Sequence, residues 1–339
     1  MPKSANEIES VMVYVGLDRL GDGLLKLPFV HGLRSAFPNA KLTWFAGKET
    51  TVYARALAPL VEGYLDEIIE HGGVGIAPKE LLRARPLKGR RFDLIIDTQK
   101  IVWTSLSARR IRHGAFISPA ARFLLSSKKP PSNYKFPKAM QRQMLDLLEI
   151  ASDKKFPSPN KLSIGITGTR RGEAQRLLPK VTGYIGFAPG SGGRPKCWPL
   201  DRYIEVARHV ADQGATPVFV IGPQEEEWID EITAALPDAI LPLQIAPADH
   251  GFDPMLTLAI GERLSKAVSN DSGIAHMLAV AGTPLVALYG PTVYEKFPPM
   301  TDTITVIKAE KYGSRDMSAI PVDAVSQALD ALPERGPDA

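Results

Sequence analysis

Asp22 is the first side chain whose position suggests chemistry, because it lies between two glycines after an expected strand. The segment Gly16–Gly23 has the glycine spacing of a phosphate-binding loop, but Asp22 replaces the lysine that such a loop needs. A carboxylate would repel phosphates, so a nucleotide phosphate loop is disfavoured here. Asp22 then either caps the following helix, which stabilises it by roughly 1 kcal/mol, or acts as a general base toward a substrate hydroxyl.

A second loop, Ala188–Pro199, has the composition of an anion-binding turn. Ser191 and Gly192 lie among further glycines, where backbone N–H groups can point at an anion, and Lys196 adds a positive charge. The alternative is an ordinary loop with a solvated lysine, but three glycines and a lysine before a helix favour phosphate binding. Cys197, the single cysteine of the chain, excludes a disulfide framework and is as compatible with packing as with reactivity.

A third motif, Ser269–His276, opens an apolar helix. Asp271 or Ser272 would cap this helix, so its first N–H groups, beginning near Gly273, and its positive dipole end suit a diphosphate. His276 falls within the first two turns of the helix. A histidine at this position can be a packing residue or a catalytic one, and the sequence leaves both open.

Three consecutive glutamates, Glu225, Glu226 and Glu227, follow another expected strand. Acidic residues are favoured in the first turn of a helix and are usually solvated there. A carboxylate just beyond a strand of a nucleotide-binding fold can also accept hydrogen bonds from ribose hydroxyls. A solvated surface is the default interpretation, and only one of the three need hold a ribose.

Several familiar motifs do not occur. The sequence has no Asp-x-Asp pair, no His/Cys/Asp group with zinc spacing and no Gly-x-Ser-x-Gly motif. We therefore expect neither a metal nor a cofactor. A bound diphosphate would be neutralised by Lys196, glycine N–H groups and a helix end.

Alternating apolar and amphipathic segments must position these residues. Expected strands cover residues 11–16, 41–46, 93–97, 184–188, 216–221, 266–269 and 285–289, and expected helices cover 24–37, 200–213, 225–235, 255–263 and 272–281. This alternation predicts an α/β protein of parallel sheets covered on both faces. The weakly periodic stretch 152–183 predicts a domain boundary, which gives domains 1–165 and 166–325 and a tail, 326–339. Two doubly wound domains facing a cleft would bind ligands at the carboxyl ends of their strands.

The composition of the 339 residues, 44% hydrophobic and 23% charged, is that of a globular protein. It excludes a disordered chain, a collagen-like fibre and a multi-span membrane protein. The start of the chain lacks the basic residues and the long apolar stretch of a secretory signal. We therefore expect a cytoplasmic protein that is at most peripheral to a membrane.

The net charge of +4 conceals a strong asymmetry. Residues 83–142 hold 15 Lys/Arg and only two acids, so this segment carries +13 and the remaining chain carries −9. Such a block fits nucleic acid or anionic lipid headgroups. Because no helix-turn-helix, RNA-recognition or zinc-finger signature is present, we expect a phosphorylated partner held at a membrane and no nucleic acid.

Taken together and in order, these motifs resemble the bacterial heptosyltransferases of glycosyltransferase family 9, which add heptose to the lipopolysaccharide inner core. The resemblance covers about residues 11–300, and its specificity comes from the order of several motifs. The residues that carry it lie in Val15–Pro28, Leu33–Trp44, Phe92–Gln99, Pro189–Pro199 and Asn270–Thr292. Lys100 departs from the family pattern, which usually has glycine after Gln99.

The resemblance implies a GT-B fold of two Rossmann-like domains, with the acceptor bound by the first and the nucleotide-sugar by the second. It also implies inverting transfer without a metal, from ADP-heptose to an anionic glycolipid at the inner membrane. Asp22 would be the base. The implied donor residues are Ser191, Gly192, Lys196, Glu225, Asp271, Ser272, Gly273 and His276, and the expected acceptor residues are Asp97, Gln99, Arg109, Arg110 and Arg112. Two alternatives are an epimerase or hydrolase of nucleotide-sugars on the same fold, and a non-catalytic binder of polyanions or lipid surfaces.

Overall fold

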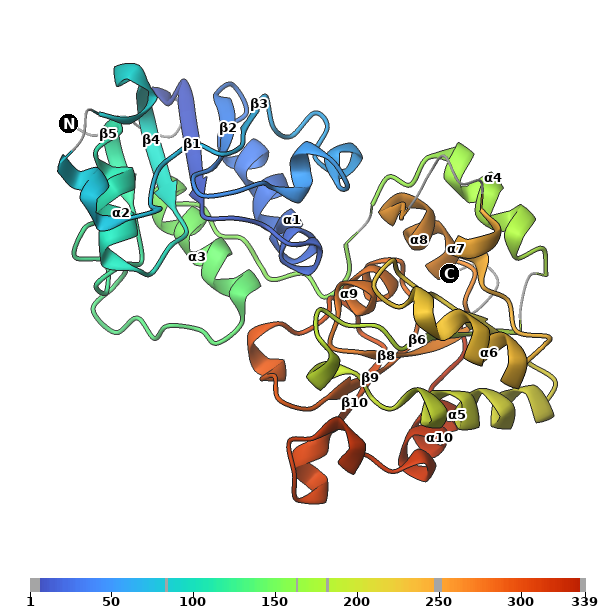
Figure 1. Cartoon of the computed structure of the whole chain (residues 1–339). Coiled ribbons are helices and arrows are strands. Elements are labelled where there is room, and N and C mark those ends of the chain that lie inside the picture. The colour runs from blue at the N-terminus through green and yellow to red at the C-terminus, as the bar shows by residue number, and fades with distance from the viewer. Residues whose placement is uncertain (1–6, 83–84, 163, 181–182, 247–251, 336–339) are drawn as a thin grey trace. The chain divides into compact units, whose positions relative to one another are not determined.

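The structure is a computed structural model of the whole chain that describes residues 7–82, 85–162, 164–180, 183–246 and 252–335 (Figure 1). The chain forms two compact units, Met1–Pro159 and Asn160–Ala339. Each unit is built around its own parallel sheet, which confirms the expected α/β class.

The sheet of the first unit has the strand order β3-β2-β1-β4-β5. Its strands are β1 (Ser10–Val15), β2 (Lys41–Ala46), β3 (Glu67–Ile69), β4 (Arg91–Asp97) and β5 (Arg112–Ile117), and its helices are α1 (Leu20–Ala36), α2 (Val102–Arg109) and α3 (Met140–Ser152). The central strands β1 and β4 are buried on both faces, which explains their uninterrupted apolar runs. Helices α1 and α3 lie side by side (Figure 1).

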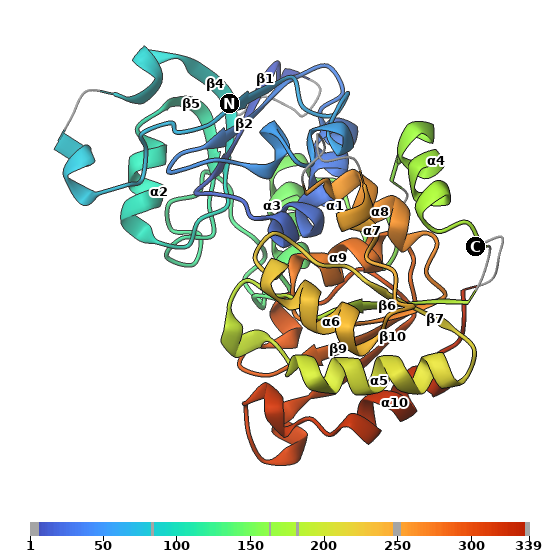
Figure 2. The same cartoon turned by 45° about the vertical axis from the view of Figure 1, so that its right-hand side comes forward.

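The sheet of the second unit has the order β10-β9-β8-β6-β7. Its strands are β6 (Tyr184–Ala188), β7 (Thr216–Phe219), β8 (Lys266–Asn270), β9 (Leu285–Tyr289) and β10 (Ile304–Lys308). Its helices are α4 (Gly168–Leu177), α5 (Leu200–Asp212), α6 (Ile229–Ala235), α7 (Pro242–Ile245), α8 (Pro254–Gly261), α9 (Gly273–Val280) and α10 (Val322–Ala331). Helices α5 and α10 pack together on one side of the sheet, and α4 and α8 pack together on the other (Figure 2).

Strand order reverses once in each sheet, between β1 and β4 in the first and between β6 and β8 in the second. At such a reversal, the loops after two neighbouring strands run in opposite directions along the sheet. A crevice then forms between these loops, beyond the carboxyl ends of the strands. The loops after β1, β6 and β8, which carry three of the sequence motifs, therefore lie at these two places, and the glutamates 225–227 follow the edge strand β7.

The predicted strands are all present, with ends that shift by a few residues. The division after Pro159 lies close to the expected boundary at residue 165. The expected tail needs correction, because residues 326–331 continue α10, whose Val325 and Leu329 are buried in the second unit. None of the helices in the described part of the chain is long and apolar enough to cross a membrane.

Candidate functional site

The loops after β6 and β8 meet at the reversal point of the second sheet. The Ser191 hydroxyl donates a 2.9 Å hydrogen bond to the backbone oxygen of Asp271, which joins the second and third sequence motifs. Strands β6 and β8 are direct neighbours, with Ala188 paired to Ser269, so the two loops leave the sheet side by side. This contact builds the crevice in which nucleotides bind in such sheets.

Asn270, the last residue of β8, fixes both ends of the loop after β6. Its side chain is fully buried, its Nδ2 donates to the Pro189 oxygen at 2.6 Å, and its Oδ1 accepts from the Trp198 N–H at 3.1 Å. Asn270 is not among the site residues predicted from the sequence. The available signal was an amide at the end of a short buried strand, where an unpaired polar group would be costly.

The positive groups of this crevice are Lys196 and the start of α9. The Lys196 Nζ lies 3.5 Å from the Asp271 Oδ2, and the lysine side chain remains 38% exposed. Ser272 caps α9, since its hydroxyl accepts from the Ala275 N–H at 3.2 Å, and Gly273 is the first helical residue. An anion here would meet an ammonium group and the unpaired N–H groups of a helix start.

Glu225 is the glutamate that adjoins this loop. A Cβ on Gly190 would lie only 2.5 Å from the Glu225 carboxyl carbon, so this carboxyl group lies directly against the loop. Burial raises the pKa of Glu225. Glu226 and Glu227 are exposed, and Glu227 forms an ion pair with Arg194.

Two further candidates of the second unit are a buried histidine, His276, and a half-buried cysteine, Cys197. His276 lies within α9 and is 5% exposed. Burial raises the pKa of the Cys197 thiol, and its Sγ lies 3.7 Å from the Gly193 oxygen. A raised pKa disfavours the reactive thiolate, so Cys197 fits the packing interpretation.

Asp22 lies in the first turn of α1, beyond the carboxyl end of β1. Its capping interpretation is wrong, because Arg19 is the residue that precedes the helix, and Asp22 is the third helical residue. The side chain is half-buried. A Cβ on Gly16 would lie 3.2 Å from the Gln99 Oε1, so the loops after β1 and β4 adjoin each other at the reversal point of the first sheet.

Asp18 holds the loop that precedes Asp22. Its fully buried carboxylate accepts hydrogen bonds from the Trp44 Nε1 at 2.8 Å and the Thr51 hydroxyl at 2.9 Å, and it pairs with Lys26 of α1. This network was not predicted, because Trp44 and Thr51 are distant from Asp18 in the sequence. Its effect is to fix the start of α1, and with it Asp22.

Asp97 ends β4 and is fully buried. The Ser118 hydroxyl and the Gln99 N–H donate to its two oxygens at 2.7 and 2.9 Å. Burial raises the pKa of Asp97 to about 6, against the lowering effect of these hydrogen bonds. Asp97 therefore positions Gln99 from within the sheet and is not exposed to a ligand.

A hollow of about 140 Å³ lies beside Gln99. Its lining includes Lys26, Lys100 and the apolar side chains of Phe136, Met140 and Met144. The Lys100 Nζ lies 4.7 Å from the centre of the Phe136 ring, which favours the cation at this place. The lysine that departs from the family pattern thus lines the hollow.

Each unit thus has candidate site residues at the reversal point of its own sheet. A model of the family described as glycosyltransferase family 9 (heptosyltransferase) matches residues 82–320. The chain belongs to glycosyltransferase family 9. It is therefore an enzyme, a glycosyltransferase of the heptosyltransferase family.

Individual relatives of this family 9 enzyme agree with the match. Lipooligosaccharide heptosyltransferase 2 of Haemophilus influenzae is 23% identical over 313 residues, which cover 88% of each chain. The solved family 9 glycosyltransferase of Veillonella parvula has a TM-score of 0.72 and 22% identity over 97% of this chain and 98% of its own. The ADP-heptose lps heptosyltransferase II of Escherichia coli has a TM-score of 0.66 and 20% identity over 96% and 98%. The fold is GT-B, as the resemblance implied.

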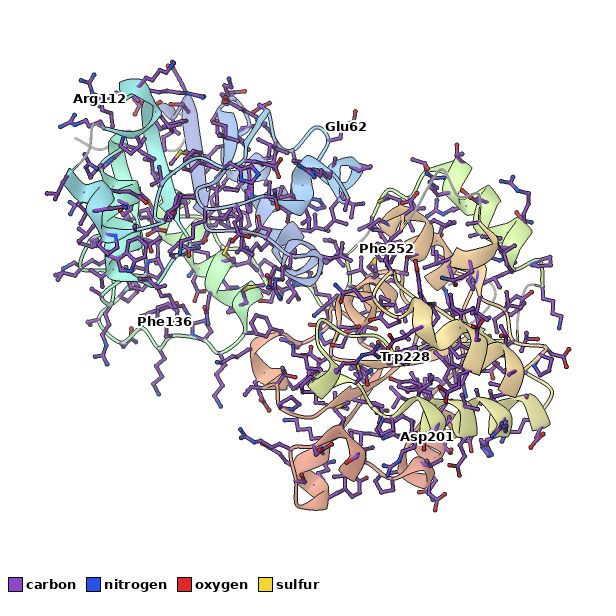
Figure 3. The ribbon with its side chains drawn as sticks, in the orientation of Figure 1. Glu62, Arg112, Phe136, Asp201, Trp228 and Phe252 are labelled. Atoms are coloured by element: carbon purple, nitrogen blue, oxygen red, sulfur yellow. The ribbon has the colours of Figure 1, made fainter. Side chains whose placement is uncertain are left out.

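The structure does not bring the three acceptor arginines to Asp22 and Gln99. Arg112 begins β5 and Arg109 ends α2, so they and Arg110 lie at the amino ends of the parallel strands, whereas Asp22 and Gln99 lie at the carboxyl ends. The reason is topological: a crossover helix runs back along the sheet, and its last residues return to the edge where the strands begin. Figure 3 shows Arg112 and Phe136 at opposite ends of the first unit.

Two hydroxyl groups of the family 9 enzyme were not singled out as site residues. The Tyr289 and Thr292 hydroxyls are buried and have no hydrogen-bond partner within the described residues. Tyr289 is the last residue of β9, and Thr292 follows this strand. Strand β9 is the neighbour of β8 in the sheet. Buried hydroxyls of this kind usually have a partner, so they are candidates for contact with a ligand or water.

Metal-binding clusters do not occur in the described part of the chain. No three His, Cys, Asp or Glu side chains there lie close enough together to hold a metal ion.

Proposed function

We propose that this family 9 glycosyltransferase transfers a heptose from ADP-heptose to a lipopolysaccharide-core acceptor, with inversion and without a metal ion. The observation that carries the proposal is the joining of the two second-unit loops by Ser191, which sets Lys196 and the start of α9 in one crevice. The names of the relatives support the sugar and acceptor, and that of the Escherichia coli structure supports ADP as the nucleotide.

The donor would lie in the second unit. Its diphosphate would contact Ser191, Gly192, Lys196 and the N–H groups that begin with Ser272 and Gly273. The positive charge of the lysine and of the helix start would stabilise the departing ADP. Glu225 would accept hydrogen bonds from the ribose, because it alone of the three glutamates is buried against the loop. Asp271 would contact the sugar hydroxyls, and His276 would support the wall of the donor site from within α9.

The acceptor would lie at the carboxyl ends of β1 and β4. Asp22 would take the proton of the acceptor hydroxyl as its oxygen attacks the anomeric carbon. A new carbon–oxygen bond forms, the bond from that carbon to the diphosphate oxygen breaks, and its electron pair leaves with ADP. Gln99 would hold the acceptor, with Asp97 as its positioning residue. Because the acceptor is an anionic glycolipid, the enzyme would work at the cytoplasmic face of the inner membrane as a peripheral protein, without nucleic acid.

The Asp22→Asn variant tests the base. We expect transfer to fall by about 10²- to 10⁴-fold, as for the loss of a general base, while ADP affinity stays within twofold of the wild type. Asp201→Asn is the matched control, because Asp201 is an exposed acid in the first turn of α5 and has no assigned role. It should transfer heptose like the wild type.

Two outcomes would contradict the proposal. Full turnover by Asp22→Asn would remove Asp22 as the base. Rapid consumption of ADP-heptose without an acceptor would instead favour an epimerase or hydrolase.

A further inference from the structure

Five arginines gather around one hollow at the amino edge of the first sheet. The hollow has a volume of about 550 Å³. It is lined by Arg85, Arg91, Arg109, Arg110, Ile111, Arg112 and His113. None of these residues is acidic, so the lining is strongly positive.

Four of the five arginines of this arginine hollow are not neutralised by an acidic side chain of the described residues. Arg85, Arg91, Arg109 and Arg112 are exposed and form no ion pair with any described residue. Other arginines of the same unit behave differently: Arg34, Arg90 and Arg142 pair with Asp66, Glu67 and Asp146. The hollow therefore gathers four guanidinium groups that no described acidic side chain neutralises.

The fold holds these arginines close together. Arg91 and Arg112 are direct partners on the neighbouring strands β4 and β5. Arg110 donates to the Glu80 oxygen, which ties the end of α2 to the short 3₁₀ helix Pro78–Leu82. Like charges placed directly opposite each other destabilise a sheet, so this arrangement is more favourable when an anion lies between them. Guanidinium groups bind phosphate through paired hydrogen bonds.

The position of the hollow separates it from the reaction. Asp22 and Gln99 lie at the carboxyl edge of the sheet, and the arginine hollow lies at its amino edge (Figure 3). A phosphate bound among the arginines is therefore remote from the hydroxyl that Asp22 would deprotonate. The hollow needs a ligand other than the reacting part of the acceptor.

We propose that the arginine hollow docks the enzyme on anionic phospholipid headgroups of a membrane surface. An exposed apolar side chain favours a lipid surface over a free phosphate: Leu82 is 91% exposed at the end of the 3₁₀ helix that Arg110 contacts. Basic residues next to exposed apolar ones are typical of proteins that lie in the headgroup region. The phosphates would bind the arginines, and Leu82 would enter the boundary of the acyl chains.

Co-sedimentation with vesicles tests this docking without any measurement of transfer. The vesicles contain phosphatidylcholine with about one-third phosphatidylglycerol, and phosphatidylcholine alone serves as the uncharged comparison. Each basic residue at such a surface raises partitioning about fivefold, so Arg91→Gln, Arg109→Gln and Arg112→Gln together should lower it roughly 100-fold. The wild type should bind phosphatidylcholine alone only weakly and should leave the charged vesicles at high salt.

The matched control removes the same charge elsewhere in the basic segment. Lys129, Lys135 and Lys138 are exposed and lie in the stretch that contains Phe136, at the other end of the unit (Figure 3). Their triple replacement by glutamine should lower partitioning less than threefold. An equal loss in both triple variants would overturn the proposal, because the whole segment would then attract the membrane without a defined site.

Other ligands are outcomes of the same experiment. If an RNA of mixed sequence binds as tightly as the vesicles and releases the protein from them, the hollow is a nucleic-acid site and the proposal is wrong. If glycerol phosphate binds as tightly as the vesicles, the site takes a free phosphate instead. A variant with lysine at positions 91, 109 and 112 keeps the positive charge and serves if the glutamine variant fails to fold. Binding of this lysine variant to the charged vesicles near the wild-type level supports docking. Loss of binding by the folded lysine variant overturns the proposal.

Discussion

Asp97 is the residue whose environment makes the clearest prediction. Burial raises its pKa to about 6 from an ordinary value of 3.8, so the folded protein binds the proton more tightly than the unfolded chain. The stabilisation from this proton is complete below about pH 4 and is lost as the pH rises through about 6. The difference between these two pKa values corresponds to about 3 kcal/mol in the free energy of unfolding.

Asp97→Asn should remove this dependence, because an amide does not titrate. The free energy of unfolding of the wild type, measured by urea, should fall relative to the variant by about 3 kcal/mol between about pH 4 and pH 7. Glu67→Gln is the control of opposite sign, since hydrogen bonds from Arg90 lower the pKa of Glu67 to about 2 and its stabilisation is lost as the pH falls. Parallel pH profiles for the wild type and Asp97→Asn would contradict the assigned environment.

The sequence identified residues whose type and place in a motif are unusual, and it missed those whose role depends on partners far along the chain. Lys196 and Asp271 come from separate motifs, and the structure places them 3.5 Å apart. Asp18 and Asn270 were not predicted, because their partners, such as Thr51 and Trp198, are distant in sequence. The three arginines were expected with Gln99 because charge and chain position do not reveal which edge of a sheet a residue occupies.

At the scale of elements, periodicity predicted the inner strands and the buried edge strand β7, and it missed the three other edge strands. The strands β3, β5 and β10 lie at edges of their sheets and are half-exposed, so their apolar runs are short or interrupted by charged residues. The inner strands are buried on both faces and keep continuous apolar runs. Burial on both faces is thus what made a strand predictable here.

Asn270, at the end of β8, holds the loop after β6 in its shape. Asn270→Ala would leave the Pro189 oxygen and the Trp198 N–H buried without partners, so the free energy of unfolding should fall by about 2–4 kcal/mol. ADP affinity, measured by calorimetry below the unfolding transition, should fall at least tenfold because Lys196 lies on the same loop. Thr257→Val separates the two effects, because it removes a buried hydrogen bond of α8 to the Asp253 oxygen, away from this loop. It should destabilise the protein and leave ADP affinity unchanged; an equal loss of affinity would show that Asn270 acts through stability alone.

At the scale of the whole molecule, the two units differ in charge, and each contains a buried apolar cluster of its own. The segment 83–142, which carries +13, belongs to the first unit. One buried cluster draws only on residues between Met12 and Phe116, and another only on residues between Ile185 and Leu332. Proteins that consist of more than one domain need not unfold in a single transition. A ligand held by one unit should therefore stabilise that unit alone.

ADP provides the test of this independence. The proposed nucleotide contacts, from Ser191 to His276, all lie in the second unit, so ADP at about 100 times its Kd should stabilise that unit by about 2.7 kcal/mol. Pulsed hydrogen exchange at rising urea concentrations reports each unit through its own strands: the midpoint for β6 and β8 should rise, and that for β1 and β4 should stay unchanged. UDP and GDP should shift the β6 and β8 midpoint less than ADP does. A rise in both units would contradict a nucleotide site formed by the second unit alone, and a larger shift with UDP or GDP would overturn ADP-heptose as the donor.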